Sequence, residues 1–137
     1  MKHLLIILIL ISILLLSSPV IGDNHKGETL YRWKTSSGNE WKGFGDKDTH
    51  TVYKGEVDES GKPNGLGFLI SPNGDKYVGS WKNGKKNGEG TETWVDGTKI
   101  IGEWKNDGLW NGIYYHKNGS IQFRLVNGKY DLSRGLD

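Results

Sequence analysis

The chain contains no cysteine and only three prolines among its 137 residues. The absence of cysteine excludes disulfides, thiolate metal sites and a cysteine nucleophile. Neither sign of charge is in large excess, because the chain has 18 lysines and arginines and 16 aspartates and glutamates, which gives a net charge of +2. Since a strong basic field is what draws a protein to a polyanion, we expect no nucleic-acid partner.

The motifs of enzymes and metal proteins are missing from the sequence as well. His25, His50 and His116 stand far apart, with no second ligand at metal-binding spacing. The glycine pairs at 65/67 and 88/90 lack the third glycine and the following helix of a dinucleotide site. Glu92 is the carboxylate best placed to meet a ligand, and an ordinary surface residue is its alternative role. We therefore expect a protein that is not an enzyme, with no catalytic residue, no metal and no cofactor.

A long apolar run occurs only at the amino terminus. Lys2 precedes an apolar stretch from Leu4 to Leu16, and Pro19 follows it. This order is typical of a secretory signal peptide. We expect residues 1–22 to form a signal-peptide helix that is cleaved after Gly22, which makes the mature protein secreted or periplasmic. The alternative is an uncleaved membrane anchor, since the 18 residues from Leu4 to Ile21 approach the roughly 20 that span a bilayer.

Glycine is abundant, with 21 residues, and it recurs at a nearly fixed period. Gly61, Gly84 and Gly108 follow one another at intervals of 23 and 24 residues. The same period links positions 53, 77 and 100, positions 57, 81 and 104, and positions 65, 88 and 112. A fixed period of this length indicates a repeat architecture.

The clearest unit covers residues 77–99 and reads YVGSWKNGKKNGEGTETWVDGTK. Its two halves alternate in the manner of strands, and Asn83-Gly84 and Asn87-Gly88 stand between them. Asn-Gly pairs suit turns that need positive φ, and the chain contains seven of them. No segment after residue 22 has a sustained helical period. The sequence therefore predicts an all-β protein: a single-layer antiparallel meander of hairpins, solenoid-like, with eight or nine strands.

Glycines also stand inside these predicted strands, where they normally weaken a sheet. Aromatic rings from neighbouring positions can lie flat over a glycine backbone and compensate for the missing side chain. We therefore expect structural glycines that act as seats for rings. They are Gly55, Gly67, Gly79, Gly90 and Gly102.

The pattern Tyr-x-Gly-x-Trp-x-x-Gly, then Gly-x-Gly, then Asp-Gly, resembles the MORN repeat (membrane occupation and recognition nexus). Three units follow this pattern, at residues 53–76, 77–99 and 100–120, with Val57 in the Trp place of the first and Ile100 in the Tyr place of the third. Residues 38–45 look like half a unit, and residues 111–129 resemble a variant repeat of small exported bacterial proteins. We expect a β extension with a partial repeat over 23–52, a repeat sheet over 53–129 and a tail over 130–137.

Similarity to MORN proteins implies a noncatalytic module that binds or scaffolds other proteins, here through an aromatic-lined β groove. The residues expected to line that groove are Tyr53, Tyr77, Trp81, Trp94, Trp104 and Trp110, with membership of the core as the alternative for each. The resemblance also allows phospholipid as a partner at a membrane surface. A patch of Lys76, Lys82, Lys85 and Lys86 would then contact anionic head groups. The oligomeric state stays open, because the terminal strands of an open sheet can pair with another copy.

Overall fold

The computed structural model describes residues 27–131, so the predicted signal peptide of residues 1–22 lies outside the described residues. Between residues 27 and 131 the chain forms ten strands and no helix. The strands are β1 (Glu28–Thr35), β2 (Gly38–Lys42), β3 (Thr51–Val57), β4 (Pro63–Ile70), β5 (Lys76–Lys82), β6 (Lys85–Thr93), β7 (Lys99–Lys105), β8 (Gly108–Tyr115), β9 (Ile121–Val126) and β10 (Lys129–Tyr130). The all-β prediction is confirmed for this part of the chain, which holds no helix long and apolar enough to cross a membrane.

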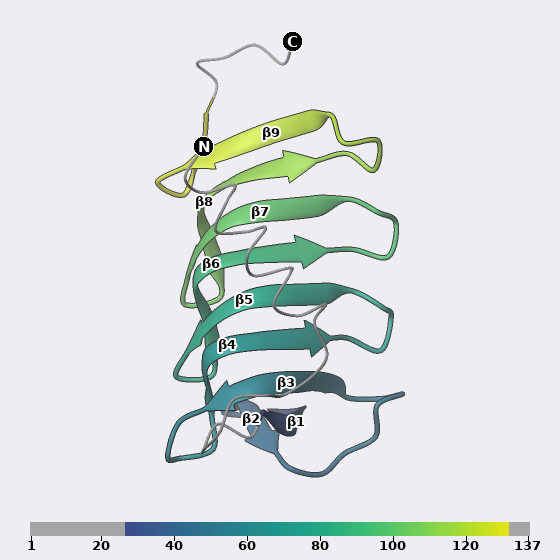
Figure 1. Cartoon of the computed structure of the whole chain (residues 1–137), viewed down its shortest axis with the longest axis vertical. Helices are drawn as coiled ribbons and strands as arrows, with labels where there is room; N and C mark the ends of the chain where they lie inside the picture. Colours follow the sequence, from purple (N-terminus) through teal and green to yellow (C-terminus); the bar gives the residue numbers. More distant parts are fainter. Residues whose placement is uncertain (1–26, 132–137) are drawn as a thin grey trace, which may run out of the picture.

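All ten strands belong to one antiparallel sheet in the order β10-β9-β8-β7-β6-β5-β4-β3-β1-β2. From β3 to β9 each strand pairs with the next along the chain, and Figure 1 shows them stacked in a ladder along the long axis of the molecule. The predicted meander is therefore confirmed over these strands. At the amino-terminal end the order departs from it, because β1 lies between β2 and β3. The predicted eight or nine strands fall short of ten.

The pairing register makes the repeats equivalent in space. Tyr53, Tyr77 and Ile100 occupy the same position in β3, β5 and β7. Two residues further along each strand stands a glycine that pairs with a glycine of the following strand. The same glycines of β4 and β6 also pair with glycines of β5 and β7, so one row of six glycines crosses the sheet. The row consists of Gly55, Gly67, Gly79, Gly90, Gly102 and Gly112.

Of the two Asn-Gly pairs inside the second repeat, only one forms a turn. Asn83 and Gly84 connect β5 to β6 with φ angles of 52° and 77°, the left-handed values that a tight hairpin turn requires. Gly88 lies within β6, although its φ is 104°. It stands next to the place where the β5–β6 register shifts, between Gly79 and Trp81. The expectation that Asn87-Gly88 stands between the strands was therefore wrong, because the bulge uses this glycine inside the strand.

The β1–β2 hairpin folds over one face of the sheet. In a flat sheet β2 would lie about 19 Å from β5, since four strand spacings of about 4.8 Å separate them. Yet the Trp41 ring of β2 lies 5.9 Å from the Trp81 ring of β5, and its indole N–H donates to the carbonyl of Gly84. The sheet therefore curls at this end, and the hairpin covers the face that carries Tyr53 and Trp81. We call this the aromatic face.

Candidate binding surfaces

A column of rings forms the core on the aromatic face. Tyr53 and Tyr77 are 0% exposed, and Trp81 and Trp104 are each 4% exposed. Neighbouring rings meet edge to face: Tyr53 and Trp81 centroids are 5.1 Å apart, Tyr77 and Trp81 5.3 Å, and Tyr77 and Trp104 5.5 Å. Such contacts add about 0.5–1.5 kcal/mol per pair to the burial of the rings themselves. Leu30, Leu69 and Ile100 complete this core.

Two of the five glycines predicted as ring seats, Gly67 and Gly90, lie directly under tyrosine rings, whereas Gly55, Gly79 and Gly102 lie closest to backbone atoms of the neighbouring strand. A Cβ atom at Gly90 would lie 2.5 Å from Cζ of Tyr77, and one at Gly67 would overlap the Tyr53 ring in the same way. Gly79 makes a different contact, since its Cβ would lie 2.5 Å from the Cα of Gly90. Gly102 has no ring above it, because Ile100 replaces tyrosine, and a Cβ there would run into the Asn111 backbone.

The polar atoms of the ring column are satisfied within the protein. The Tyr53 hydroxyl donates to the carbonyl of Glu56 at 2.6 Å, and the Tyr77 hydroxyl donates to that of Ser80 at 3.2 Å. The indole N–H groups of Trp81 and Trp104 donate to the carbonyls of Gly67 and Gly90. Burial raises the pKa of the Tyr53 and Tyr77 phenols, with the charge of Glu56 adding to the effect at Tyr53 and that of Glu92 at Tyr77.

These contacts correct the predicted aromatic groove. Tyr53, Tyr77, Trp81 and Trp104 present almost no surface, so a ligand would have to displace the core to touch them. The other two predicted residues are more exposed than these four, although Trp94 packs against the same core. Trp110 is half-buried beside Gly128, with the Lys105 ammonium 4.0 Å from its ring centroid. Trp94 is half-buried against Tyr114, 6.2 Å between centroids.

Trp94 begins a second group of rings that reaches the carboxyl-terminal end of the sheet. Tyr114 stacks on Phe123 with centroids 3.8 Å apart, and Phe123 meets Tyr130 at 5.2 Å. Trp94, Tyr114 and Phe123 are half-buried, whereas Tyr130 is 67% exposed. We call these four residues the C-terminal aromatic row. Sequence reasoning missed Tyr114, Phe123 and Tyr130, because they fall where the repeat pattern fades and β8 pairs with β9.

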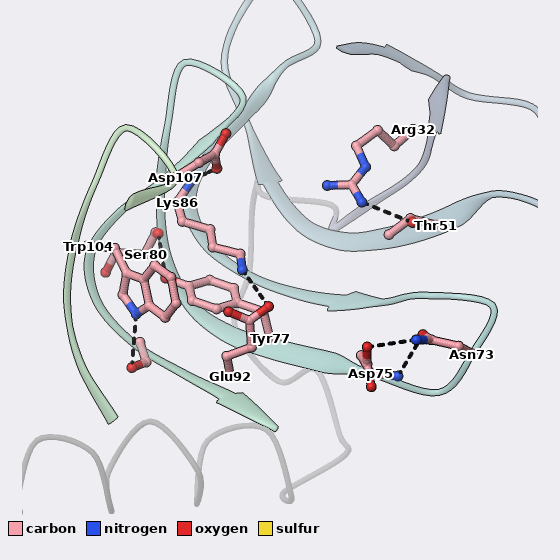
Figure 2. A network of polar contacts seen from close by, with 11 residues as sticks. Arg32, Thr51, Asn73, Asp75, Tyr77, Ser80, Lys86, Glu92, Trp104 and Asp107 are labelled. Carbon is pink, nitrogen blue, oxygen red and sulfur yellow. Dashed lines mark hydrogen bonds and ion pairs between the residues drawn. The ribbon is translucent and has the colours of Figure 1, made fainter. Parts of the chain in front are cut away.

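The predicted lysine patch is divided by the structure. Lys86 Nζ bonds Glu92 Oε1 at 2.8 Å, and their side chains are only 13% and 21% exposed. The same ammonium lies 4.7 Å from the Tyr77 ring centroid and 4.6 Å from that of Trp104. Figure 2 shows the Lys86 side chain beside these two rings. Lys86 is therefore not available to a lipid head group. Lys76 and Lys82 stand at opposite ends of β5, about 20 Å apart at the usual rise of a strand.

The Lys86–Glu92 pair occupies positions that are apolar in the neighbouring repeats. Lys86 pairs with Trp81 in the register, where Leu109 pairs with Trp104 in the next repeat. Glu92 lies opposite Tyr77, where Leu69 lies opposite Tyr53. Glu92 is thus neither a plain surface residue nor a free carboxylate, since its ion pair with Lys86, whose ammonium lies over two rings, holds it in the aromatic face.

Arg32 faces the same region from β1. Its guanidinium donates to the Thr51 hydroxyl at 3.2 Å (Figure 2). Burial lowers its pKa, and the negative charges of Asp107 and Glu92 partly offset that effect. Asp107 accepts from the backbone N–H of Lys86 at 2.8 Å, so it fastens the β7–β8 turn to the start of β6.

A polar cleft opens at the hairpin tips, between the folded-over β1–β2 hairpin and the turns that follow β3 and β5. Its volume is about 760 Å³, within the range of about 300–1,000 Å³ that is usual for ligand sites. Trp41 forms one wall, and Asn39 of β2 and turn residues including Gly61, Asn83 and Asp107 form the rest.

Metal-binding geometry is not found among residues 27–131, where no three potential ligands cluster. His50 packs its ring on Trp33 with centroids 4.1 Å apart, and His116 closes the β8–β9 turn by backbone hydrogen bonds to Ser120 and Gly119.

Comparison with known families agrees with the repeat geometry. The family model described as MORN repeat matches residues 53–76 and 77–99. These are the first two of the three units that the period and the strand register define. A search of curated proteins found no match. The chain thus contains two MORN repeats built on the same strand pairs and glycine seats, and these support a MORN-repeat protein.

Proposed function

We propose that this protein is a noncatalytic, exported interaction module that binds an extended segment of a partner protein along the C-terminal aromatic row. MORN repeats form modules that are often involved in binding. The observation that carries the proposal is the contrast between the two groups of rings. The column on Tyr53 and Tyr77 is sealed, whereas the row ending at Tyr130 stays partly open to solvent.

The open row has the composition of a binding surface. Tyrosine, tryptophan and phenylalanine are enriched at protein interfaces, where a few of them supply most of the binding energy. The stacked rings of Tyr114 and Phe123 are already fixed by each other, so a ligand loses little freedom in ordering them.

The edge of the sheet at this place suits an added strand. β10 pairs with β9 at Lys129–Val126 and Tyr130–Leu125, and the backbone N–H of Asp131 donates to the carbonyl of Arg124 at 2.9 Å. Beyond the pair at Leu125, no strand within residues 27–131 covers the outer edge of β9 at Ile121–Phe123. A peptide that adds there would gain backbone hydrogen bonds from β9, and its alternate side chains would reach the rings.

Export is part of the proposal and is supported by the sequence of residues 1–22, with Lys2 before an apolar stretch and Pro19 after it. The lipid alternative has no comparable support, because Lys86 is held by Glu92 within the aromatic face.

The proposal is tested with peptides selected from a random library of extended segments against the exported chain. Affinity is measured by fluorescence anisotropy for the parent protein and for Phe123→Ala, with Trp110→Ala as the matched aromatic control outside the row. We expect micromolar binding, a loss of about 30-fold with Phe123→Ala, which is about 2 kcal/mol, and no change with the control. Thermal unfolding of each variant confirms that it is folded.

Heteronuclear NMR locates the bound peptide. We expect the backbone amides of Ile121–Phe123 to become protected from exchange when peptide binds. Equal affinity of parent and Phe123→Ala, or a failure to select any peptide, would contradict the proposal. Salt-sensitive flotation with anionic vesicles in place of peptide binding would favour the phospholipid function instead.

A further inference from the structure

The polar cleft at the hairpin tips is assembled from segments that are distant in the sequence. The folded-over hairpin contributes Ser37 to Trp41, and the turns after β3 and β5 contribute Ser60 to Lys62 and Asn83 to Lys85. Asp107 closes the end beside β8. The cleft shares no residue with the C-terminal aromatic row, so this inference is independent of the proposed peptide site.

The charges that line the cleft balance. Lys62 and Lys85 are offset by Glu40 and Asp107, so the lining sums to zero. Glu40 also pairs with Lys42 at 3.3 Å, and Asp107 already accepts a backbone hydrogen bond from Lys86. A balanced lining does not select for an ion of either sign. The ligand that fits it is polar and uncharged.

Hydrogen-bonding groups without protein partners converge on this space. Within the part of the chain that the structure describes, the side-chain amides of Asn39 and Asn83 make no hydrogen bond. Each amide offers two N–H donors and a carbonyl acceptor. Gly38 and Gly61 have no side chain, and no atom lies within 4 Å of a Cβ position at either, so a ligand can approach their backbones closely.

Trp41 adds a rigid apolar wall beside these groups. Its ring meets Tyr53 at 63° and Trp81 at 90°, and its N–H is fixed on the Gly84 carbonyl at 3.3 Å. The residue is nevertheless only half-buried. A fixed indole next to free amides matches a molecule that has hydroxyl groups on its rim and an apolar face of C–H bonds.

We propose that the cleft binds a short uncharged oligosaccharide. The pyranose C–H face packs on Trp41, and the hydroxyl groups exchange hydrogen bonds with the amides of Asn39 and Asn83. The volume of about 760 Å³ accommodates more than one sugar ring.

The test titrates the exported chain with triacetylchitotriose, cellotriose and maltotriose and follows the Trp41 indole N–H by NMR. Trigalacturonate and a neutral tripeptide are the comparison ligands. We expect at least one neutral trisaccharide to shift the Trp41 signal with a dissociation constant of about 1 mM or less. The decisive variant is Asn39→Ala combined with Asn83→Gly, which keeps the turn because glycine accepts the φ of 52° at residue 83.

The double variant should bind at least tenfold more weakly. Asn127→Gly is the matched control, because Asn127 has the same φ of 52° in the β9–β10 turn, away from the cleft. Unchanged thermal unfolding shows that both proteins are folded. The proposal is overturned if no neutral trisaccharide shifts Trp41, if only trigalacturonate or the tripeptide does, or if the double variant binds as well as the parent.

Discussion

Replacing Gly90 by alanine tests the role of the glycine seats. The new Cβ would lie 2.5 Å from Cζ and 2.6 Å from Cε2 of Tyr77, much closer than van der Waals contact. The ring cannot retreat, because Tyr77 is 0% exposed and meets Trp81 and Trp104 edge to face. Overpacking of this kind costs about 1–3 kcal/mol, and the gain from a less flexible unfolded chain returns about 0.4–1 kcal/mol.

We therefore expect Gly90→Ala to lower the free energy of unfolding by about 2 kcal/mol and the melting temperature by about 8 °C. Urea unfolding followed by tryptophan fluorescence measures the change. Gly108→Ala is the control, since the nearest atom to a Cβ there is the Lys105 carbonyl at 3.4 Å, an ordinary contact. It should change stability by less than about 0.5 kcal/mol.

The same substitutions made in a Tyr77→Ile protein distinguish a clash with the tyrosine ring from a clash with the backbone. Ile100 holds the tyrosine position in the third repeat, so Tyr77→Ile is a substitution that the fold already contains. In that background Gly90→Ala should cost less than in the parent, because the ring is gone; a backbone cost remains, since a Cβ at the equivalent Gly112 of the third repeat would lie 3.0 Å from the Ile101 carbonyl oxygen. Gly79→Ala should stay destabilising, because its Cβ meets the Gly90 backbone. If Gly90→Ala lowered the free energy of unfolding equally in the parent and in the Tyr77→Ile protein, Gly90 would not be a seat for the Tyr77 ring.

Two further predictions concern the charges of the aromatic face and the buried phenols. Lys86→Leu or Glu92→Leu alone should destabilise by about 2 kcal/mol by leaving one charge unpaired, whereas the double variant should unfold within about 1 kcal/mol of the parent in urea. A double variant as unstable as the singles would contradict this. Because burial raises the pKa of Tyr53 and Tyr77, their contribution to stability is complete below the unfolded value of about 10 and is lost as pH rises above it. Near-ultraviolet titration should show two phenols that ionise only on unfolding, and alkaline unfolding of Tyr77→Phe should begin at higher pH.

The repeat period predicted most of the sheet because it reports on local geometry. Tyrosine at one position and glycine two residues later place a ring over a bare backbone, whatever lies further away. The same reasoning did not decide between core and groove for Trp81 or Trp104. That decision depends on how the strands curl, which brings Trp41 across from β2 to close the column.

The remaining surfaces are formed by residues that are not part of the repeat pattern, so the repeat period could not predict them. Lys86 and Glu92 look like separate hydrophilic residues in the sequence, and only the register shows that they face each other beside two rings. Tyr114 and Phe123 come together because β8 pairs with β9, beyond the last regular repeat. The β1–β2 hairpin forms one wall of the cleft. No sequence motif predicts that β1 of this hairpin pairs with β3.

Hydrogen exchange of the six indole N–H groups, followed by NMR, tests most directly whether the regular rings are core and the open surface lies elsewhere. Trp81 and Trp104 donate to the carbonyls of Gly67 and Gly90 and are each 4% exposed, so their N–H signals should exchange slowly. Those of Trp94 and Trp110, which are half-buried, should exchange quickly. Fast exchange at Trp81 and Trp104, at a rate like that of Trp94, would mean that the column is an open groove and would contradict this account.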